Sequence, residues 1–171
     1  PNVVYAATGW VLNSNQGDAA VYKSTNFGNT WVKLNTGIPS TGSVQRVKLA
    51  IAPNDNNYIY ALCVDTQNGL YGFYKSTNAG TNWTYIPPSL NVLDGNQGTG
   101  SGGQGNYDLG FIVNATNKNT VYVGGINLWG STDGAVNFDP IAHWTTSYGP
   151  TIHGDIHYID RQASTGRYFV C

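Results

Sequence analysis

Charged residues and long apolar runs are scarce in this sequence, and each shortage excludes a class of protein. Only 10% of the 171 residues are charged, with 8 Lys and Arg against 9 Asp and Glu. Without a basic surface, nucleic acid and anionic membranes are poor candidate partners. No apolar run approaches the roughly 20 residues of a membrane-spanning helix, so we expect no direct membrane insertion. Methionine is absent and no signal peptide is visible, which favours a mature or truncated product.

Cysteine is also scarce, since the chain has two. Two cysteines are too few for a disulfide framework, and Cys63 and Cys171 are too far apart in sequence for a zinc pair. Each follows a similar apolar strand, and the repeat described below places those strands two units apart. We therefore predict two free, buried thiols.

The abundant residues favour strands joined by tight turns. There are 22 glycines, aromatic residues make up 13% of the chain, and Asn, Thr and Ser fill the polar positions. No segment shows a 3.6-residue apolar period between a cap and a terminating glycine, so helix signals are missing. The composition therefore predicts an all-β protein.

Two sequence elements recur together along the chain. The first element contains Ser-Thr-Asn-x-Gly or a variant, and its serines are 52 and 55 residues apart: Ser24, Ser76 and Ser131. The second is a short apolar strand after a polar turn: 2–6, 57–61, 119–123 and 166–170. Two elements that keep one period in the fifties indicate one repeated unit, and short strands at this period are typical of four-stranded propeller blades.

The serine-containing element, which we call the box, can be interpreted as a hairpin clip. Its Asn or Asp side chain can accept bonds from nearby backbone N–H groups, and its glycine suits a left-handed conformation. The box residues are Ser24, Asn26, Gly28 and Trp31; Ser76, Asn78, Gly80 and Trp83; and Ser131 and Asp133. The third box has Ala135 in place of glycine and Phe138 in place of tryptophan. We expect a structural role, with Trp31 and Trp83 buried against their own blades.

The box resembles the Asp-box, Ser-x-Asp-x-Gly-x-Thr-Trp, of the BNR-like repeat family, although Asn26 and Asn78 replace the aspartate. Proteins with this box include sialidases, xyloglucanase-type glycoside hydrolases and sortilin-type receptors. The chain is most similar to secreted Bacteroidetes-type surface proteins, in which strings like 121–126 and His153-x-Asp155-x-His157 occur between boxes. The resemblance implies an all-β fold, a β-propeller of four-stranded antiparallel blades with Asp-box turns.

Because a closed propeller usually has four to eight blades, three boxes predict an incomplete propeller. The repeat divides the chain into blades at 1–43, 44–104 and 105–150, with the start of the next blade at 151–171. The remaining blades of the same parent protein are then the first expected partner. The Gly-rich stretch 94–106 joins two blades, and we expect it to form a mobile rim loop near the channel.

Candidate site residues lie in the strands that should surround the central channel. Repeat alignment makes Asp108 and Asp155 equivalent, with Tyr107 beside the first. On a strand, His153, Asp155 and His157 would point to one face. These residues favour three interpretations: a divalent metal site at His153, Asp155 and His157, an acid/base cluster with Asp108, or a polar channel lining that contacts ligand.

The resemblance leaves three functions open. The first is a secreted or cell-surface module that binds glycan or a surface protein, or that acts as a scaffold. The second is part of an inverting glycoside hydrolase that resembles xyloglucanases, with Asp108 and Asp155 as the catalytic carboxylates. The third is a sortilin-like peptide receptor. A sialidase is disfavoured, because Gly37-Ile38-Pro39 lacks the arginine of the sialidase motif.

Overall fold

A computed structural model describes residues 2–9, 19–34, 36–39, 42–146 and 149–171 of the chain. The described residues form thirteen β-strands: β1 Val4–Ala7, β2 Val21–Ser24, β3 Val32–Leu34, β4 Val44–Ile51, β5 Ile59–Asp65, β6 Leu70–Ser76, β7 Thr84–Ile86, β8 Gly110–Val113, β9 Val121–Gly124, β10 Leu128–Ser131, β11 Asp139–Ala142, β12 Ile159–Arg161 and β13 Tyr168–Val170. In this part of the chain, no helix is long and apolar enough to cross a membrane.

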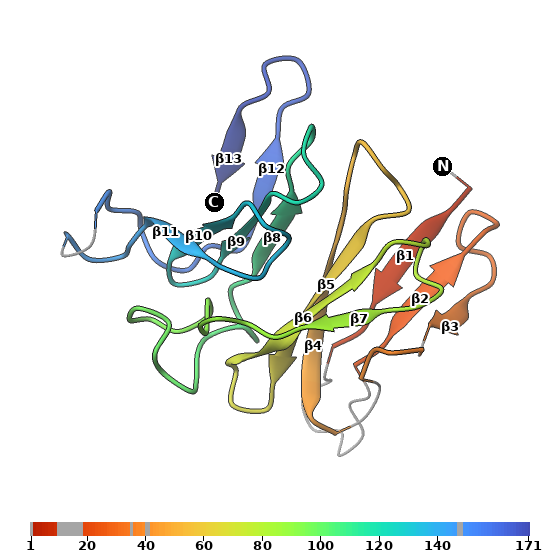
Figure 1. Cartoon of the computed structure of the whole chain (residues 1–171), viewed down its shortest axis with the longest axis horizontal. Helices are drawn as coiled ribbons and strands as arrows, with labels where there is room; N and C mark the ends of the chain where they lie inside the picture. The colour runs from red at the N-terminus through yellow and green to blue at the C-terminus, as the bar shows by residue number, and fades with distance from the viewer. Residues whose placement is uncertain (1, 10–18, 35, 40–41, 147–148) are drawn as a thin grey trace.

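The strands form four antiparallel sheets, which follow the order of the chain. The first sheet is β1-β2-β3, the second β4-β5-β6-β7, the third β8-β9-β10-β11 and the fourth β12-β13. Figure 1 shows the sheets side by side, and β4, β8 and β12 contact one another in succession. The chain is an incomplete β-propeller, as predicted, with two complete four-stranded blades among the described residues.

Alternation of side chains explains why the middle of the second sheet is apolar throughout. Successive residues of a strand point to opposite faces. In β5, Ile59, Ala61 and Cys63 pack with the first sheet, whereas the residues between them pack with the third. Because both faces are covered, six consecutive residues of this strand are buried.

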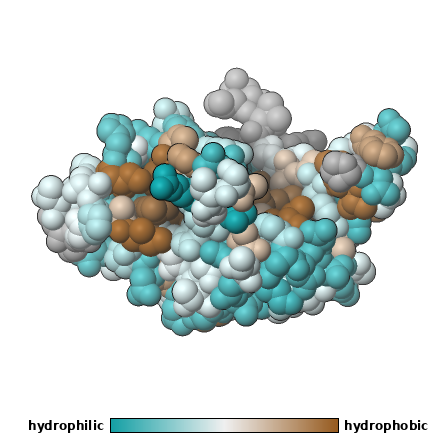
Figure 2. Space-filling view, turned by 90° about the horizontal axis from the view of Figure 1, so that it is seen from above, coloured by the Kyte–Doolittle hydropathy of each residue, from teal (hydrophilic) through white to brown (hydrophobic). Residues whose placement is uncertain are grey.

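The core consists of two layers between blades. One layer joins the first and second sheets and includes Val21, Ile38 and Trp83. The other joins the second and third sheets and includes Leu62, Phe73 and Phe138. Figure 2 shows further apolar side chains at the surface, in separate groups toward the two ends of that view. The blades are thus held together by the faces of neighbouring sheets.

The three boxes form the same turn at the ends of β2, β6 and β10. In the first box, the hydroxyl of Ser24 accepts a bond of 2.9 Å from the N–H of Gly28, and Oδ1 of Asn26 accepts one of 2.9 Å from the N–H of Thr30. The other two boxes repeat both bonds, with serine–amide distances of 2.8 and 3.1 Å. Each turn therefore satisfies its own backbone donors.

The third box adopts the same turn with its glycine at a different position. Each box has two adjacent residues with positive φ: Phe27 and Gly28, Ala79 and Gly80, and Gly134 and Ala135. Glycine supplies the second position in the first two boxes and the first position in the third. Ala135 therefore adopts φ 73° where the other boxes have glycine.

The prediction that both box tryptophans are buried is correct for Trp83 and wrong for Trp31. Trp83 is 5% exposed and packs against the first sheet, and Phe138 stacks on Phe73 of the second sheet at 5.1 Å between ring centroids. The box aromatic thus packs between its own blade and the preceding one. Trp31 is 41% exposed, because no described sheet lies before the first.

The cysteines are both free, as predicted, but they differ in burial. Cys63 lies on the first-sheet side of β5, and burial raises the pKa of its thiol to about 12. The prediction that Cys171 is buried is wrong, because this residue is exposed beyond the end of β13. The fourth sheet has two described strands, and no other sheet of the described residues follows it.

Candidate functional site

Asp108 lies just before β8, at the end of the inner strand of the third sheet. Its side chain is fully buried, and neither carboxylate oxygen has a hydrogen-bond partner among the described residues. Burial raises the pKa of Asp108 to about 6, and the nearby charge of Asp155 adds to this effect. A buried carboxyl with this pKa can exchange a proton near neutral pH.

Three other side chains gather around this point. Nη1 of Arg46, from β4, donates to the carbonyl oxygens of Gly105 at 2.9 Å and of Tyr107 at 3.5 Å. The exposed ring of Tyr107 meets the ring of His157 edge-on, with centroids 4.7 Å apart. Arg46 and His157 both lower the pKa of Asp108, against the larger effect of burial. Asp108, Tyr107 and His157 thus lie together near the inner strands.

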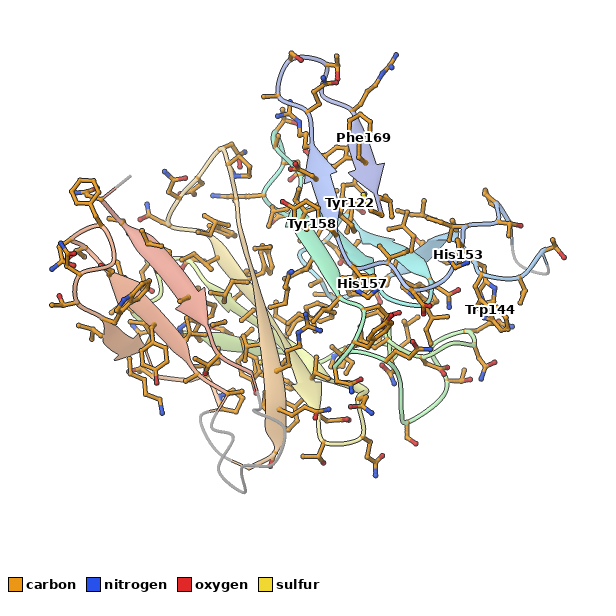
Figure 3. The ribbon with its side chains drawn as sticks, turned by 180° about the vertical axis from the view of Figure 1, so that it is seen from behind. Tyr122, Trp144, His153, His157, Tyr158 and Phe169 are labelled. Carbon is orange, nitrogen blue, oxygen red and sulfur yellow. The ribbon has the colours of Figure 1, made fainter. Side chains whose placement is uncertain are left out.

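The expected alignment of His153, Asp155 and His157 on one strand face is wrong. Residues 152–158 form no strand, since β12 begins only at Ile159, and Asp155 adopts φ 67°. This backbone turns the two histidines apart, and Figure 3 shows His153 near Trp144 with His157 separate from them. The described residues contain no group of three His, Cys, Asp or Glu side chains that could hold a metal ion.

A second site lies around Trp144, where a pocket of about 430 Å³ opens at the surface. The indole of Trp144 is 51% exposed, and it forms one apolar wall together with Ile126. The remaining side chains that line the pocket are polar: Asn96, Gln104, His153 and Asp155. A half-exposed aromatic ring beside amides, an imidazole and a carboxylate can contact both the face and the hydroxyl groups of a sugar.

Hydrogen bonds to the indole and to the backbone of Trp144 fix this residue in place. Nε1 of Trp144 donates to the carbonyl oxygen of Gly95 at 2.7 Å, and its backbone N–H donates to Oδ1 of Asn127 at 3.0 Å. Asn127 is fully buried, and its amide nitrogen reaches the carbonyl oxygen of Asn96 at 3.2 Å. Nε2 of the buried His143 lies 3.2 Å from the same oxygen. These contacts hold the ring and the 94–96 backbone as one unit.

Hydrogen bonds also organise the loop 94–106 that forms part of the pocket wall. The amide nitrogen of Asn91 donates to the carbonyl oxygens of Gly100 and Gly102, at 2.9 and 2.8 Å. Oδ2 of Asp94 accepts a bond of 2.9 Å from the N–H of Gly100. Together with the bonds from Asn127, which lies between β9 and β10, these contacts join the loop to itself and to the third sheet.

Sequence reasoning missed Trp144 and the residues that fix it, Asn127 and His143. They lie outside the two repeated elements, so the repeat period does not predict their positions in the blade. A tryptophan that belongs to no box was an available signal, because it is an aromatic residue without a repeat-based structural role.

The sequence is similar to parts of two xyloglucanases. No family model matches the chain. A xyloglucanase from a Paenibacillus species is 28% identical over 88% of this chain. Xyloglucanase Xgh74A from Acetivibrio thermocellus is 36% identical over 50% of it. The chain thus has xyloglucanase homologues, and it spans only 16% and 10% of the length of these two proteins.

Comparison with solved structures supports the fold. The GH74 enzyme of Niastella koreensis superposes on 99% of this chain with a TM-score of 0.61 and 23% identity, and this chain covers 24% of that enzyme. At this identity, the likeness establishes a shared β-propeller architecture.

Proposed function

We propose that this chain is a polysaccharide-binding segment of a glycoside-hydrolase-like β-propeller and that the Trp144 pocket holds a neutral β-glucan such as xyloglucan. The half-exposed, fixed indole of Trp144 in a pocket lined by polar side chains carries this proposal. The xyloglucanase homologues favour a polysaccharide over a protein ligand. Because such a polymer lies outside cells, a secreted or cell-surface location follows from the proposal.

The arrangement of the pocket suits a sugar ring. A pyranose ring presents apolar C–H groups on its face, which stack on an indole, and hydroxyl groups at its edge, which need hydrogen-bond partners. Asn96 and Gln104 supply amides, and His153 supplies an imidazole. Since Asn127 holds the backbone N–H of Trp144 and the carbonyl oxygen of Gly95 holds its indole, little side-chain entropy is lost when a ligand stacks on the ring.

Binding of a xyloglucan oligosaccharide, measured by isothermal titration calorimetry, tests this function. Trp144→Ala should weaken binding about tenfold, the effect of losing one aromatic contact. Trp31→Ala is the matched control, because Trp31 is also exposed but belongs to the first sheet. Equal affinities for the parent chain and Trp144→Ala would contradict the proposed function.

Hydrolysis is a second candidate function, and Asp155 is the observation that favours it. This residue lines the Trp144 pocket and also raises the pKa of Asp108. Inverting hydrolysis uses two carboxylates roughly 6.5–9.5 Å apart, one of them with a raised pKa as the acid. However, the Asp108 side chain has no exposed surface in this structure, so substrate does not reach it as it lies. This burial makes binding the better supported function.

A reducing-sugar assay on xyloglucan distinguishes the two functions. If Asp155 acts as a catalytic carboxylate, Asp155→Asn should abolish release of reducing ends while thermal stability stays unchanged. If the chain only binds, the parent chain should release none and should still show calorimetric binding.

A further inference from the structure

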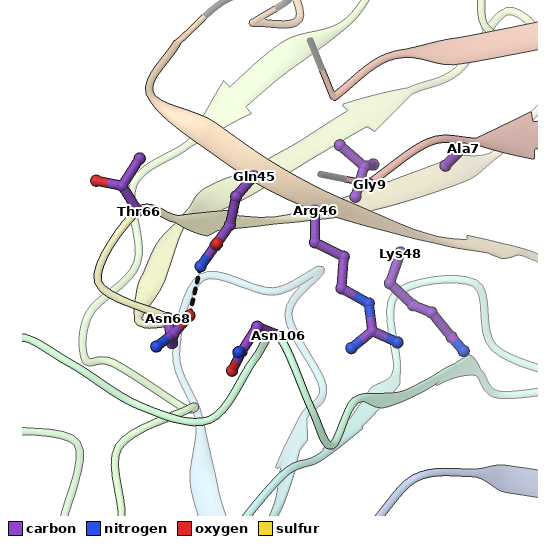
Figure 4. Close-up of a pocket in the computed structure, with 9 residues that line it drawn as sticks. Ala7, Gly9, Gln45, Arg46, Lys48, Thr66, Asn68 and Asn106 are labelled. Carbon is purple, nitrogen blue, oxygen red and sulfur yellow. Dashed lines mark hydrogen bonds between the residues drawn. The ribbon is translucent and has the colours of Figure 1, made fainter. Parts of the chain in front are cut away.

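A separate pocket lies beside the inner strand of the second sheet, away from Trp144. Its volume is about 640 Å³, and β4 contributes Gln45, Arg46 and Lys48 to its wall. Figure 4 shows the side chains of Arg46 and Lys48 extending side by side from β4 toward the segment that carries Asn106. Neither the repeat nor the proposed glucan site gives this pocket a role.

The two basic side chains face the same way because they are two residues apart on one strand. Both are half-buried, so they are partly shielded from water. Burial lowers the pKa of both groups, and the charge of Arg46 further lowers the pKa of Lys48. Two neighbouring positive charges that repel each other in a partly desolvated pocket are destabilising unless an anion compensates them.

The described residues around these charges compensate them only in part, through the charge of Asp108 on Arg46. Among the described residues, no carboxylate lines the pocket, and neither Arg46 nor Lys48 has an ion pair within 4 Å. Nη1 of Arg46 donates to the carbonyl oxygens of Gly105 and Tyr107, and these bonds fix the guanidinium in position. Asp108 is near enough to affect the pKa of Arg46, but it is buried and does not line the pocket.

The other lining groups indicate which anion fits. Thr66, Asn68 and Asn106 contribute a hydroxyl and two amides, which are hydrogen-bonding partners for neutral polar groups such as sugar hydroxyls. Gln45 donates to Oδ1 of Asn68 at 2.6 Å and so orients that amide. A ligand with one carboxylate and several hydroxyls matches this set better than a compact anion does. The volume lies within the usual range of small-ligand pockets.

We infer that the pocket around Arg46 and Lys48 binds an acidic saccharide, with the carboxylate of a uronic acid between the two cations. The amides and the hydroxyl of the pocket then contact the sugar hydroxyls. This site is independent of the Trp144 pocket, where the ligand is neutral.

Calorimetric titration of the whole chain with a trigalacturonate tests this inference, and its methyl ester serves as the uncharged control ligand. Lys48→Gln should weaken trigalacturonate binding about tenfold or more, because it removes one charge-assisted contact. Lys48→Arg should retain binding. Lys33→Gln is the matched control variant, since Lys33 is exposed on β3 and outside the pocket. Added salt should also weaken binding.

Several outcomes would overturn the inference: undetectable binding of trigalacturonate, equal binding of the methyl ester, or unchanged affinity in Lys48→Gln. Direct calorimetric binding of a peptide with a free C-terminal carboxylate, together with undetectable binding of trigalacturonate, would assign the pocket to peptides instead. Binding of neutral xyloglucan oligosaccharide to Lys48→Gln reports the Trp144 pocket separately, so failure at one site does not obscure the other.

Discussion

At the residue scale, the surroundings of a side chain decide its role more than its type does. Trp31 and Trp83 occupy the same position of two boxes, yet Trp83 is buried under the first sheet and Trp31 is half-exposed. Two aspartates that the repeat aligns also differ, since Asp108 is buried without partners and Asp155 lies on a turn with positive φ. The sequence placed these residues near the inner strands, but burial depends on which blade covers them.

The two box tryptophans should therefore differ in their effect on stability. Trp83→Ala should cost about 3–5 kcal/mol in free energy of unfolding, as for other large buried aromatics. Trp31→Ala should cost about 1 kcal/mol or less, because much of its ring already contacts water. Trp83→Phe should be milder than Trp83→Ala, since Phe138 fills the equivalent place in the third box. Urea unfolding of the three variants checks this order, and equal losses for Trp31→Ala and Trp83→Ala would contradict it.

The buried carboxyl of Asp108 should make stability fall as pH rises. Its pKa of about 6 in the folded chain lies above the ordinary value of 3.8, so the folded state binds the proton more tightly. The resulting stabilisation is complete below pH 4 and is lost as pH rises through 6, by up to about 3 kcal/mol.

Asp108→Asn should remove this pH dependence, because asparagine has nearly the same shape and no charge to bury. Relative to the parent chain, the variant should gain stability between pH 4 and pH 7.5, as measured by urea unfolding at several pH values. Asp160→Asn, on the exposed surface, is the control. A parent chain whose stability rises over this range, relative to Asp108→Asn, would refute the assigned burial effect.

At the element scale, local hydrogen bonding explains why the boxes were predictable. Each box satisfies its own backbone donors with its serine and its Asn or Asp, so a short stretch of sequence is sufficient to specify the turn. The segment 152–158 contains no such self-satisfying turn motif, and the expectation of a strand there was wrong. The repeat does not specify the Trp144 pocket, because it forms where the 94–106 loop meets Ile126, Trp144 and residues 153–155.

The box glycines should differ in how they tolerate alanine. Gly28 and Gly80 both have φ above 80°, so alanine costs about 1–2 kcal/mol at either position. At Gly80, a Cβ would also lie 2.6 Å from Cδ1 of Leu34, across the interface with the first sheet. A Cβ at Gly28 would meet only Trp31, at an ordinary 3.5 Å.

Gly80→Ala should therefore lower the free energy of unfolding by about 1 kcal/mol more than Gly28→Ala does. Thermal or urea unfolding of the two variants gives this difference directly. A smaller loss for Gly80→Ala would show that the close approach of the first two blades is not part of what stabilises the chain.

At the scale of the whole molecule, the blade faces at the two ends of the stack lack the cover that the inner faces have. The first sheet exposes Trp31 and Val32. Between the third sheet and the two described strands of the fourth, an apolar pocket of about 420 Å³ is lined by side chains such as Tyr122, Ile141 and Val170, so the fourth sheet covers this face only in part. Within the described chain, equivalent faces are buried by a neighbouring blade, so these two surfaces are suited to further blades.

The isolated chain should consequently associate through these faces as its concentration rises. The double variant Trp31→Ser, Ile141→Ser should shift it toward a monomer in sedimentation velocity, and replacement of the exposed but polar Asn56 by Ser should not. A parent chain that stays monomeric over a wide range of concentration would argue against apolar blade faces as interaction surfaces.

A crystal structure of the chain with a xyloglucan oligosaccharide tests most directly whether the Trp144 pocket binds a polysaccharide. We expect one sugar ring stacked on the indole of Trp144, with hydroxyl groups in contact with Asn96 and His153. An oligosaccharide bound elsewhere on the propeller, with the indole of Trp144 still exposed to solvent, would contradict the account.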